Sequence, residues 1–255
     1  MQDDISWGLK LSYSWVEIPM RFFKSALSHL LDFIYPASCM LCGLRLETDS
    51  RLCQDCIDHL LTAVDVRVHQ ERSEFVHLTG PIHFDGVVTC WPLIPEIETL
   101  IHAAKYQRSK SLAIQLGHWA GAALLSTLNA WDIDCIIPVP LHRKRIRHRE
   151  YNQSSLICRG LSDSFSLPVR EDVLVRHRNT RTQTKLDATR RQENVRGAFS
   201  VHMPEMNIFR RILLLDDVVT TGATINACAA TLKEAGVEQV WGVALARPRL
   251  IVESL

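Results

Sequence analysis

The most constraining feature of this chain is LLLDDVVTTGAT, at residues 213–224, where three leucines run directly into two adjacent aspartates. Leucines are typical of a buried strand, whereas Asp216 and Asp217 are side chains that a strand interior excludes. In parallel sheets, ligands bind at the carboxyl ends of strands, where loops present polar groups without disturbing the core. The segment therefore predicts a strand that ends at a binding site.

The residues after the aspartates lead into a predicted helix N-terminus, where successive backbone N–H groups form an anion-binding concavity. A bare phosphate there would be repelled by the carboxylates, so vicinal hydroxyls or a Mg²⁺ ion must lie between them. A ribose 5-phosphate satisfies both halves. The alternative, a helix N-cap behind two solvent-facing acids, has no use for adjacent carboxylates. The loop comprises Val219, Thr220, Thr221, Gly222, Ala223 and Thr224.

This segment resembles the 5-phosphoribosyl-1-pyrophosphate (PRPP) motif of type I phosphoribosyltransferases. The resemblance implies that Asp216 and Asp217 bind the ribose hydroxyls with Mg²⁺ and that residues 219–224 grip the 5′-phosphate. Neither a P-loop motif nor a G-x-G-x-x-G motif occurs in the chain, so those two modes of phosphate binding are set aside.

A PRPP site also needs a pocket for pyrophosphate, and two polar segments are candidates. The loop LHRKRIRHR follows a predicted strand and suits a diphosphate, although a solvated basic run that contacts nucleic acid is the alternative. The stretch 176–199 is too polar for the core and has the length of a lid that excludes water. Together they supply the candidates Arg143, Arg145, Arg147, Arg149, Arg178, Gln183 and Arg191.

The order of the segments PVPLHRKRIRHREYNQ, R-N-T-x-T-Q, R-x-x-N-V-R-G-A-F and DDVVTTGAT resembles the ComF family over roughly residues 30–250. That family comprises phosphoribosyltransferase-like proteins associated with DNA uptake and competence. Where it usually reads Arg-Gly-Phe-Asn-Gln, this chain reads REYNQ at 149–153. Because Glu150 replaces a conformationally permissive glycine, either the loop bends elsewhere or pyrophosphate binding is weakened.

Two C-x₂-C knuckles, separated by ten residues, indicate a metal module near the N-terminus. Two such turns supply four thiolates for a tetrahedral structural Zn²⁺, with no position left open for catalysis. A disulfide or a redox-active C-x₂-C is the competing interpretation, but neither explains two matched knuckles. The remaining Cys90, Cys135, Cys158 and Cys228 are expected in the core. The predicted zinc ligands are Cys39, Cys42, Cys53 and Cys56.

Helices and strands alternate from about residue 82, which predicts an α/β fold with a mainly parallel sheet flanked by helices, like a type I phosphoribosyltransferase. We expect three parts: an amphipathic helical segment at 1–35, a small zinc-ribbon-like module at 36–80 and a phosphoribosyltransferase-like domain at 81–255. For residues 20–35, packing on the rest of the protein is favoured over binding to a membrane surface.

The net charge of +1 provides no global field to capture nucleic acid, and no segment reads as a membrane span or signal peptide. We therefore expect a cytoplasmic protein. Three functions fit: an enzyme that transfers phosphoribose from PRPP to an unknown acceptor, a PRPP sensor without turnover, and an accessory protein that handles single-stranded DNA. A partner protein of the competence machinery is also compatible with the resemblance.

Overall fold

A computed structural model of the chain describes residues 37–47, 50–106, 109–178, 192–193, 195–202 and 209–249. The expected helix at 20–35 and the lid residues Gln183 and Arg191 lie outside these ranges. Contacts divide the chain into two units, Met1–Cys53 and Gln54–Leu255. Among the described residues, no helix is both long and apolar enough to cross a membrane.

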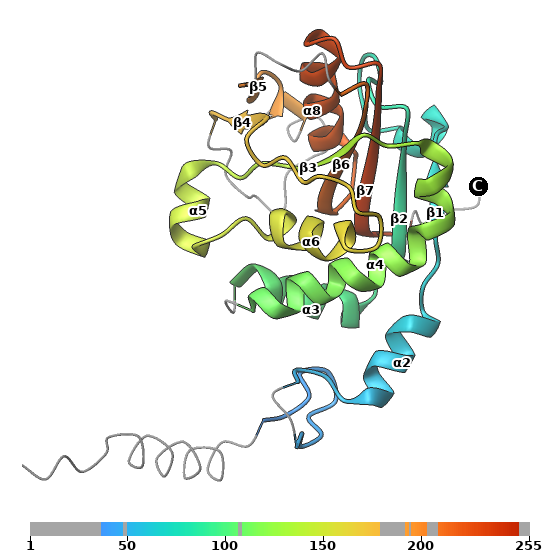
Figure 1. Ribbon diagram of the computed structural model, residues 1–255, viewed down its shortest axis with the longest axis vertical. Coiled ribbons are helices and arrows are strands. Elements are labelled where there is room, and N and C mark those ends of the chain that lie inside the picture. Colours follow the sequence, from blue (N-terminus) through green and yellow to red (C-terminus); the bar gives the residue numbers. More distant parts are fainter. Residues whose placement is uncertain are drawn as a thin grey trace, which may run out of the picture. The chain divides into compact units, whose positions relative to one another are not determined.

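The larger unit is built on a five-stranded sheet in the order β1-β2-β7-β6-β3, which confirms the expected mainly parallel α/β fold (Figure 1). Four strands are parallel, and β1 pairs antiparallel with β2 at one edge. Since β1 precedes Gly80, the sheet begins upstream of the domain boundary expected there. The strands are β1 (Arg67–His69), β2 (Gly86–Pro92), β3 (Cys135–Pro138), β6 (Arg211–Val218) and β7 (Gln239–Arg247).

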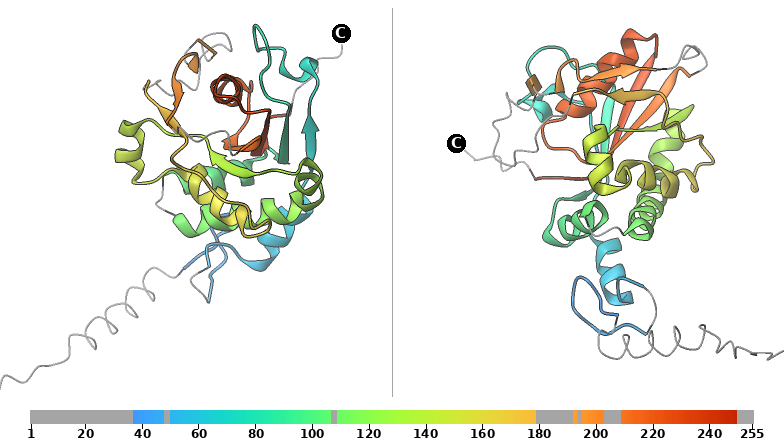
Figure 2. Two further views of the ribbon diagram at one scale, coloured as in Figure 1. Left: turned by 45° about the horizontal axis from the view of Figure 1, so that its top comes forward. Right: turned by 90° about the vertical axis from the view of Figure 1, so that its left-hand side faces the viewer.

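Helices cover both faces of this sheet (Figure 2). One face carries α8 (Ala223–Glu234), and the other carries α4 (Lys110–Trp131) and α6 (Gln153–Ser162), with α3 (Pro95–Tyr106) beside α4. The α4–α6 contact is very close, because a Cβ at Gly160 would lie 2.0 Å from the Ile114 carbonyl oxygen. Residues 212–215 of β6 are fully buried, as expected for a central parallel strand covered on both sides.

Smaller elements lie around the sheet. The run that ends near Val175 forms β4 (Leu174–Arg176), which pairs with β5 (Phe199–Val201) in a separate antiparallel sheet. The 3₁₀ helix η1 (Arg72–Phe75) places Phe75 in the core against Phe84. The helix α2 (Gln54–Thr62) is tied to the sheet by a 2.9 Å hydrogen bond from Trp91 Nε1 to the Leu60 carbonyl oxygen.

Candidate functional site

Asp216 and Asp217 lie near the carboxyl end of β6, and their side chains face opposite sides of the sheet. Successive side chains alternate across a strand, and β6 extends to Val218, so the two carboxylates cannot point the same way. Asp217 is 6% exposed and accepts hydrogen bonds from Lys105 Nζ at 2.8 Å and Gln153 Nε2 at 2.7 Å. Asp216 is partly buried and accepts one from the Asp217 backbone N–H at 2.9 Å. Asp217 is therefore held from the α3 and α6 side, which leaves Asp216 as the more accessible acid.

The surroundings of Asp216 make its ionisation costly. Burial and the neighbouring Asp217 carboxylate raise the pKa of Asp216 from 3.8 to about 7, while Lys105 and Arg176 act in the opposite direction. The shift favours the protonated acid in the folded state, so the resulting stability is present below pH 4 and is lost as the pH rises towards 7.

Replacing Asp216 with asparagine tests that coupling. We expect Asp216→Asn to be more stable than the wild type near pH 8, with a difference that grows between about pH 4 and 7 and is level above 7, because only the wild type must ionise a desolvated carboxyl. Urea unfolding at a series of pH values measures the difference. A difference in stability that is constant across the whole pH series contradicts the expectation.

A chain of polar contacts continues from Asp217 towards the basic segment. Arg149 donates from Nη1 to Gln153 Oε1 and from Nη2 to the Tyr106 hydroxyl, each at 2.9 Å. The same guanidinium lies 4.7 Å from the centre of the Tyr106 ring. Residues from α3, α6 and the basic segment are thus joined to the end of β6 in one network.

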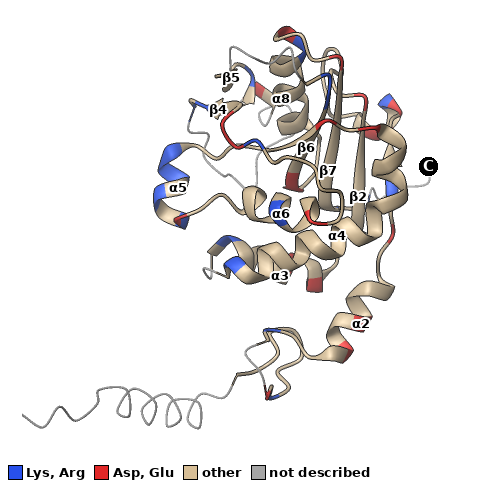
Figure 3. Ribbon diagram, viewed as in Figure 1, with Lys and Arg blue, Asp and Glu red and all other residues tan. Residues whose placement is uncertain are grey.

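The basic segment expected as a loop is instead the short helix α5 (Arg143–Arg149), which carries Lys and Arg along much of its length (Figure 3). Its N-cap is His142, whose Nδ1 accepts a hydrogen bond from the Lys144 backbone N–H at 3.2 Å. Arg145 and Arg149, one helical turn apart, are partly buried, whereas Arg143 and Arg147 are exposed.

Helical periodicity therefore separates the predicted arginines into two groups. Burial, followed by the charges of Arg176 and Arg149, lowers the pKa of Arg145, and the Asp217 carboxylate opposes this shift. Arg145 and Arg149 thus belong to the neighbourhood of the aspartates, and Arg143 and Arg147 face solvent. Arg178 is also exposed and donates a long hydrogen bond, of 3.4 Å, to the Arg196 carbonyl oxygen.

A bend elsewhere in the basic segment was one of the two expected consequences of having Glu150 in place of glycine, but the bend occurs at this residue itself. This residue is the C-cap of α5, with φ of 70° in the left-handed region, and its backbone N–H donates to the Ile146 carbonyl oxygen at 2.7 Å. The chain therefore bends at Glu150 itself, in the conformation that glycine adopts most easily.

A glycine at this position should relieve the strain of that conformation. We expect Glu150→Gly to raise the free energy of unfolding by roughly 0.5–1 kcal/mol. A Cβ in the left-handed region costs about 1–2 kcal/mol, and the greater freedom of glycine in the unfolded chain offsets part of this gain. Urea denaturation measures the change. Glu150→Ala, which removes the carboxylate but keeps the Cβ, is the control, and equal stabilisation by both variants would rule out the backbone explanation.

The loop after β6 lies at the N-terminus of α8, as the sequence predicts. Its geometry is fixed by Gly222, the N-cap, which has φ of 80°. A Cβ on Gly222 would lie 2.9 Å from Cδ1 of the buried Phe75 ring. Thr221 is buried, and its Oγ1 accepts a hydrogen bond from the Ala223 backbone N–H at 3.3 Å. Thr220 is exposed, Thr224 is partly buried and Val219 is buried.

Sequence reasoning missed two cations near the aspartates. Lys105, at the end of α3, forms an ion pair with Asp217 across 112 residues of chain. Arg176, in β4, is buried, lies 5.2 Å from the centre of the Phe199 ring and acts on the pKa of Asp216. Lys105 lies in no motif, and Arg176 is the first residue of the polar stretch 176–199 but was not singled out, so only the fold shows that both lie near the aspartates. A partial indication that Gln153 belongs to the site came from the sequence, because this residue matches the end of the family's basic segment.

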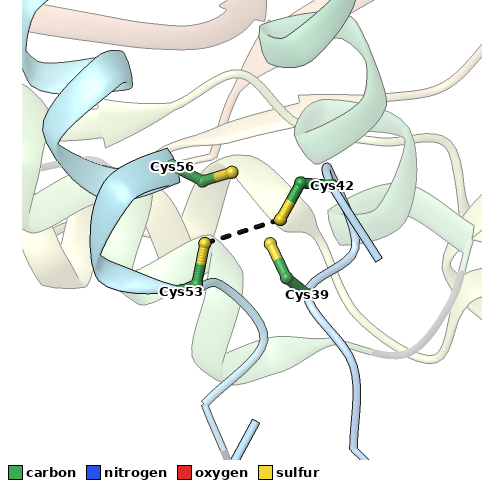
Figure 4. A group of neighbouring side chains, drawn as sticks. All are labelled: Cys39, Cys42, Cys53 and Cys56. Atoms are coloured by element: carbon green, nitrogen blue, oxygen red, sulfur yellow. Dashed lines mark hydrogen bonds between the residues drawn. The ribbon is translucent and has the colours of Figure 1, made fainter. Parts of the chain in front are cut away.

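The four predicted cysteines come together (Figure 4). One sulfur from each of Cys39, Cys42, Cys53 and Cys56 lies within 4.8 Å of the others, and Cys42 and Cys53 are 3.6 Å apart. Sulfurs bound to a tetrahedral zinc lie about 3.8 Å apart, given Zn–S bonds of about 2.3 Å. This four-thiol set therefore fits a structural zinc.

Backbone N–H groups in this cluster favour the thiolate form of Cys39, which is the form that binds a metal cation. Burial opposes ionisation of Cys39, but N–H groups of Cys42, Cys53 and Leu41 lower the pKa of its thiol to about 6. Burial instead raises the pKa of each of the other four cysteines, which are fully buried in the core as expected: Cys90, Cys135, Cys158 and Cys228.

Metal content gives a direct test of the cluster. We expect one zinc ion per purified chain, and its loss in Cys53→Ser, because a hydroxyl is a poor replacement for a thiolate ligand. Elemental analysis by mass spectrometry measures the stoichiometry. Cys158→Ala is the matched control, and its zinc content should equal that of the wild type. Full zinc retention in Cys53→Ser would exclude this four-thiolate site.

Comparisons with known proteins agree with both parts of the chain. The double zinc ribbon domain family matches residues 30–66, and the phosphoribosyl transferase domain family matches residues 152–249. Among solved structures, the glutamine PRPP amidotransferase of B. subtilis matches with a TM-score of 0.34 and 21% identity, over 54% of this chain and 26% of that chain. That structural likeness is too weak to bear on fold or function.

Two curated relatives match over most of their length. Competence protein F of Haemophilus influenzae is 30% identical over 214 residues, which are 82% of this chain and 84% of that protein. DNA utilization protein YhgH of Escherichia coli K12 is 31% identical over 208 residues, 80% of this chain and 88% of that protein. The chain therefore belongs to the ComF family, with an N-terminal double zinc ribbon domain and a phosphoribosyl transferase domain.

Proposed function

We propose that this protein binds PRPP with Mg²⁺ at the carboxyl end of β6 and serves DNA uptake as a phosphoribosyltransferase-like protein of the ComF type. One observation carries the PRPP proposal. The partly buried carboxylate of Asp216 precedes, by only a few residues, the glycine-capped N-terminus of α8. A carboxylate beside an anion cradle suits a ligand that carries hydroxyls and a phosphate.

In this proposal the two aspartates have different roles. Asp216 accepts from a ribose hydroxyl, and its hard oxygen donors also fit Mg²⁺, which would neutralise the pyrophosphate charge. Asp217 is already bonded to Lys105 and Gln153, so it would bind ribose directly only by exchanging one of them. Its role is then to position Lys105 and the network that reaches Arg149.

The rest of PRPP would be divided between two elements. Backbone N–H groups at the start of α8 and the hydroxyls of Thr220, Thr221 and Thr224 would bind the 5′-phosphate, while Arg145 and Arg149 would bind pyrophosphate. Transfer to an acceptor would need no protein nucleophile, because these groups orient PRPP and stabilise the departing pyrophosphate. A PRPP sensor would use the same contacts without turnover.

A titration tests binding. Mg²⁺–PRPP is added to the full-length, zinc-loaded protein in a calorimeter at pH 8, and we expect micromolar affinity. Asp216→Asn should weaken binding by roughly 10- to 100-fold, the worth of a hydrogen bond to a charged group. Asp172→Asn, which changes an exposed aspartate paired with Arg170, is the control. No heat of binding in the wild type would overturn the proposal. If PRPP binds, pyrophosphate release in the presence of candidate acceptors separates an enzyme from a sensor.

The exposed face of α5 supports a second activity, contact with single-stranded DNA. Arg143, Lys144 and Arg147 are all exposed there, and the names of both relatives concern competence or DNA use. Binding through phosphate contacts weakens steeply with salt. We would compare oligonucleotide affinity at 50 and 200 mM salt for the wild type and a triple alanine variant at these positions. Equal affinity and equal salt dependence of the two proteins would remove this activity.

A further inference from the structure

A cavity lies at the carboxyl ends of β2 and β7, and β7 adjoins β6 in the sheet. It has a volume of about 310 Å³ and is bounded by the ends of β1, β2 and β7. Its apolar wall includes Trp91, Pro92 and Pro248. The polar side chains around it are Asp65, Arg67, His69, Glu74, Thr89, Arg247 and Arg249. A volume of this size is at the lower end of small-molecule sites.

Arg247 is the unusual group of this cavity. It is 5% exposed, donates from Nη2 to the Glu74 carbonyl oxygen and lies over the Phe75 ring, 4.6 Å from its centre. Its Nε and Nη1 atoms are buried and have no hydrogen-bond partner among the described residues. A buried donor left unsatisfied costs about 1–3 kcal/mol, and more when the group is charged. In native proteins such a donor is usually satisfied by protein groups or ordered water, and a bound ion or ligand can take the same place.

Both acids in the cavity already have hydrogen-bond or ion-pair partners other than Arg247. Asp65 forms an ion pair with Arg67 at 2.8 Å, and Glu74 Oε1 lies 2.5 Å from His69 Nδ1. Over the described part of the chain, no carboxylate lies within the 4.0 Å ion-pair distance of Arg247. Glu74 acts on the guanidinium only at longer range, where it opposes the lowering of the Arg247 pKa by burial. The guanidinium therefore still has N–H donors that are unpaired among the described residues, and exposed Arg249 adds a second cation at the rim.

We propose that this cavity binds the carboxylate or phosphate group of a small molecule, with Arg247 as the buried donor and Arg249 as a cation at the rim. The cavity combines these positive charges with an apolar wall. The ligand class is therefore a small organic anion whose apolar part lies against Trp91 and Pro248. The assignment does not depend on PRPP binding at Asp216, because it rests on a different cavity.

Phe75 links this cavity to the loop that begins α8. Its ring contacts Arg247 on one side, and the backbone of Gly222 approaches the same ring so closely that a Cβ would lie 2.9 Å from Cδ1. The two anion sites are thus neighbours that share one buried aromatic side chain. A ligand at Arg247 is therefore placed beside the proposed PRPP site and not on a remote surface.

Crystallography with heavy-atom anions locates the ligand directly. Crystals of the full-length protein are soaked separately in selenate and in 4-bromobenzoate, which stand for the phosphate and carboxylate sources, and anomalous peaks are mapped. We expect a peak within hydrogen-bonding distance of the Arg247 guanidinium, which turns its unpaired N–H donors towards the anion, with at least one probe. The probe that gives the peak identifies the chemistry. Absence of both peaks from this cavity overturns the proposal, and a selenate peak at residues 220–224 alone would leave the PRPP site intact while removing this one.

Variants extend the test to solution. Calorimetry with 4-bromobenzoate or inorganic phosphate, whichever anion class gives the peak, should show binding that is at least tenfold weaker in Arg247→Gln. Because Arg247 also contacts Glu74 and Phe75, that variant can lose its fold. Arg249→Ala, at an exposed position, keeps the assay interpretable, and we expect threefold to tenfold weaker binding. Unchanged affinity in Arg249→Ala and in folded Arg247→Gln contradicts the assignment.

Discussion

Gly222→Ala is expected to lower the free energy of unfolding by about 2–4 kcal/mol and to reduce PRPP affinity sharply. Two costs add. The backbone has φ of 80°, which disfavours any residue with a Cβ, and the new methyl would lie 2.9 Å from Cδ1 of Phe75. Phe75 is 1% exposed and packs edge-on against Phe84, so it has little room to move. Urea unfolding and calorimetry measure the two effects.

Gly236→Ala is the matched control, because it separates the backbone cost from the clash. Gly236 follows α8 with φ of 96°, and a Cβ there would have no atom within 4 Å. We expect it to cost only about 1–2 kcal/mol, the backbone part alone. A second variant, Gly222→Ala with Phe75→Leu, should recover part of the loss. Equal effects of the two glycine substitutions would show that contact with Phe75 does not matter.

Lys105→Met is expected to destabilise the protein by about 2–4 kcal/mol, because it leaves the nearly buried Asp217 side chain without its ion-pair partner and with one side-chain donor. The Lys105 and Asp217 side chains are 21% and 8% exposed, so solvent screens the pair weakly. Loss of this cation also raises the pKa of Asp216 further, since Lys105 normally lowers it. PRPP affinity at pH 7 should therefore fall as well. Urea unfolding measures stability, and calorimetry measures affinity.

A double variant distinguishes the buried charge from simple loss of packing. In Lys105→Met with Asp217→Asn, the acid is neutral, so we expect most of the lost stability to return. Lys144→Met, at an exposed position of α5, is the control for removing a lysine. If the double variant is as unstable as the sum of the two single variants, the ion pair does not carry the effect.

The sequence predicted those parts of the site that depend only on residues adjacent in the chain. The apolar run of β6 ending in acids, the glycine at the start of α8 and the paired cysteine knuckles each follow from neighbouring residues. The opposite orientation of the two aspartates was missed, because the strand was expected to end where the leucines meet the aspartates. Since β6 continues to Val218, strand alternation separates the two side chains.

The features that the sequence did not predict depend on contacts between segments distant in the chain or on the residues that cap the ends of a helix. Lys105 meets Asp217, and Arg176 approaches Asp216, only because the fold brings α3 and β4 to the end of β6. The basic segment was expected as a loop that follows a strand, but it forms the helix α5. His142 at its N-cap and the left-handed bend at its C-cap allow it to form.

The central claim is that the carboxylate of Asp216, with its raised pKa, holds the ribose of PRPP. Its most direct test is PRPP affinity at pH 6 and pH 8, measured by calorimetry for the wild type and Asp216→Asn. With a pKa of about 7, Asp216 is roughly 10% ionised at pH 6 and 90% ionised at pH 8. Titration of PRPP itself affects both proteins equally. We predict that wild-type affinity rises between the two pH values several-fold more than the affinity of the variant. Parallel changes in the two proteins would contradict the account.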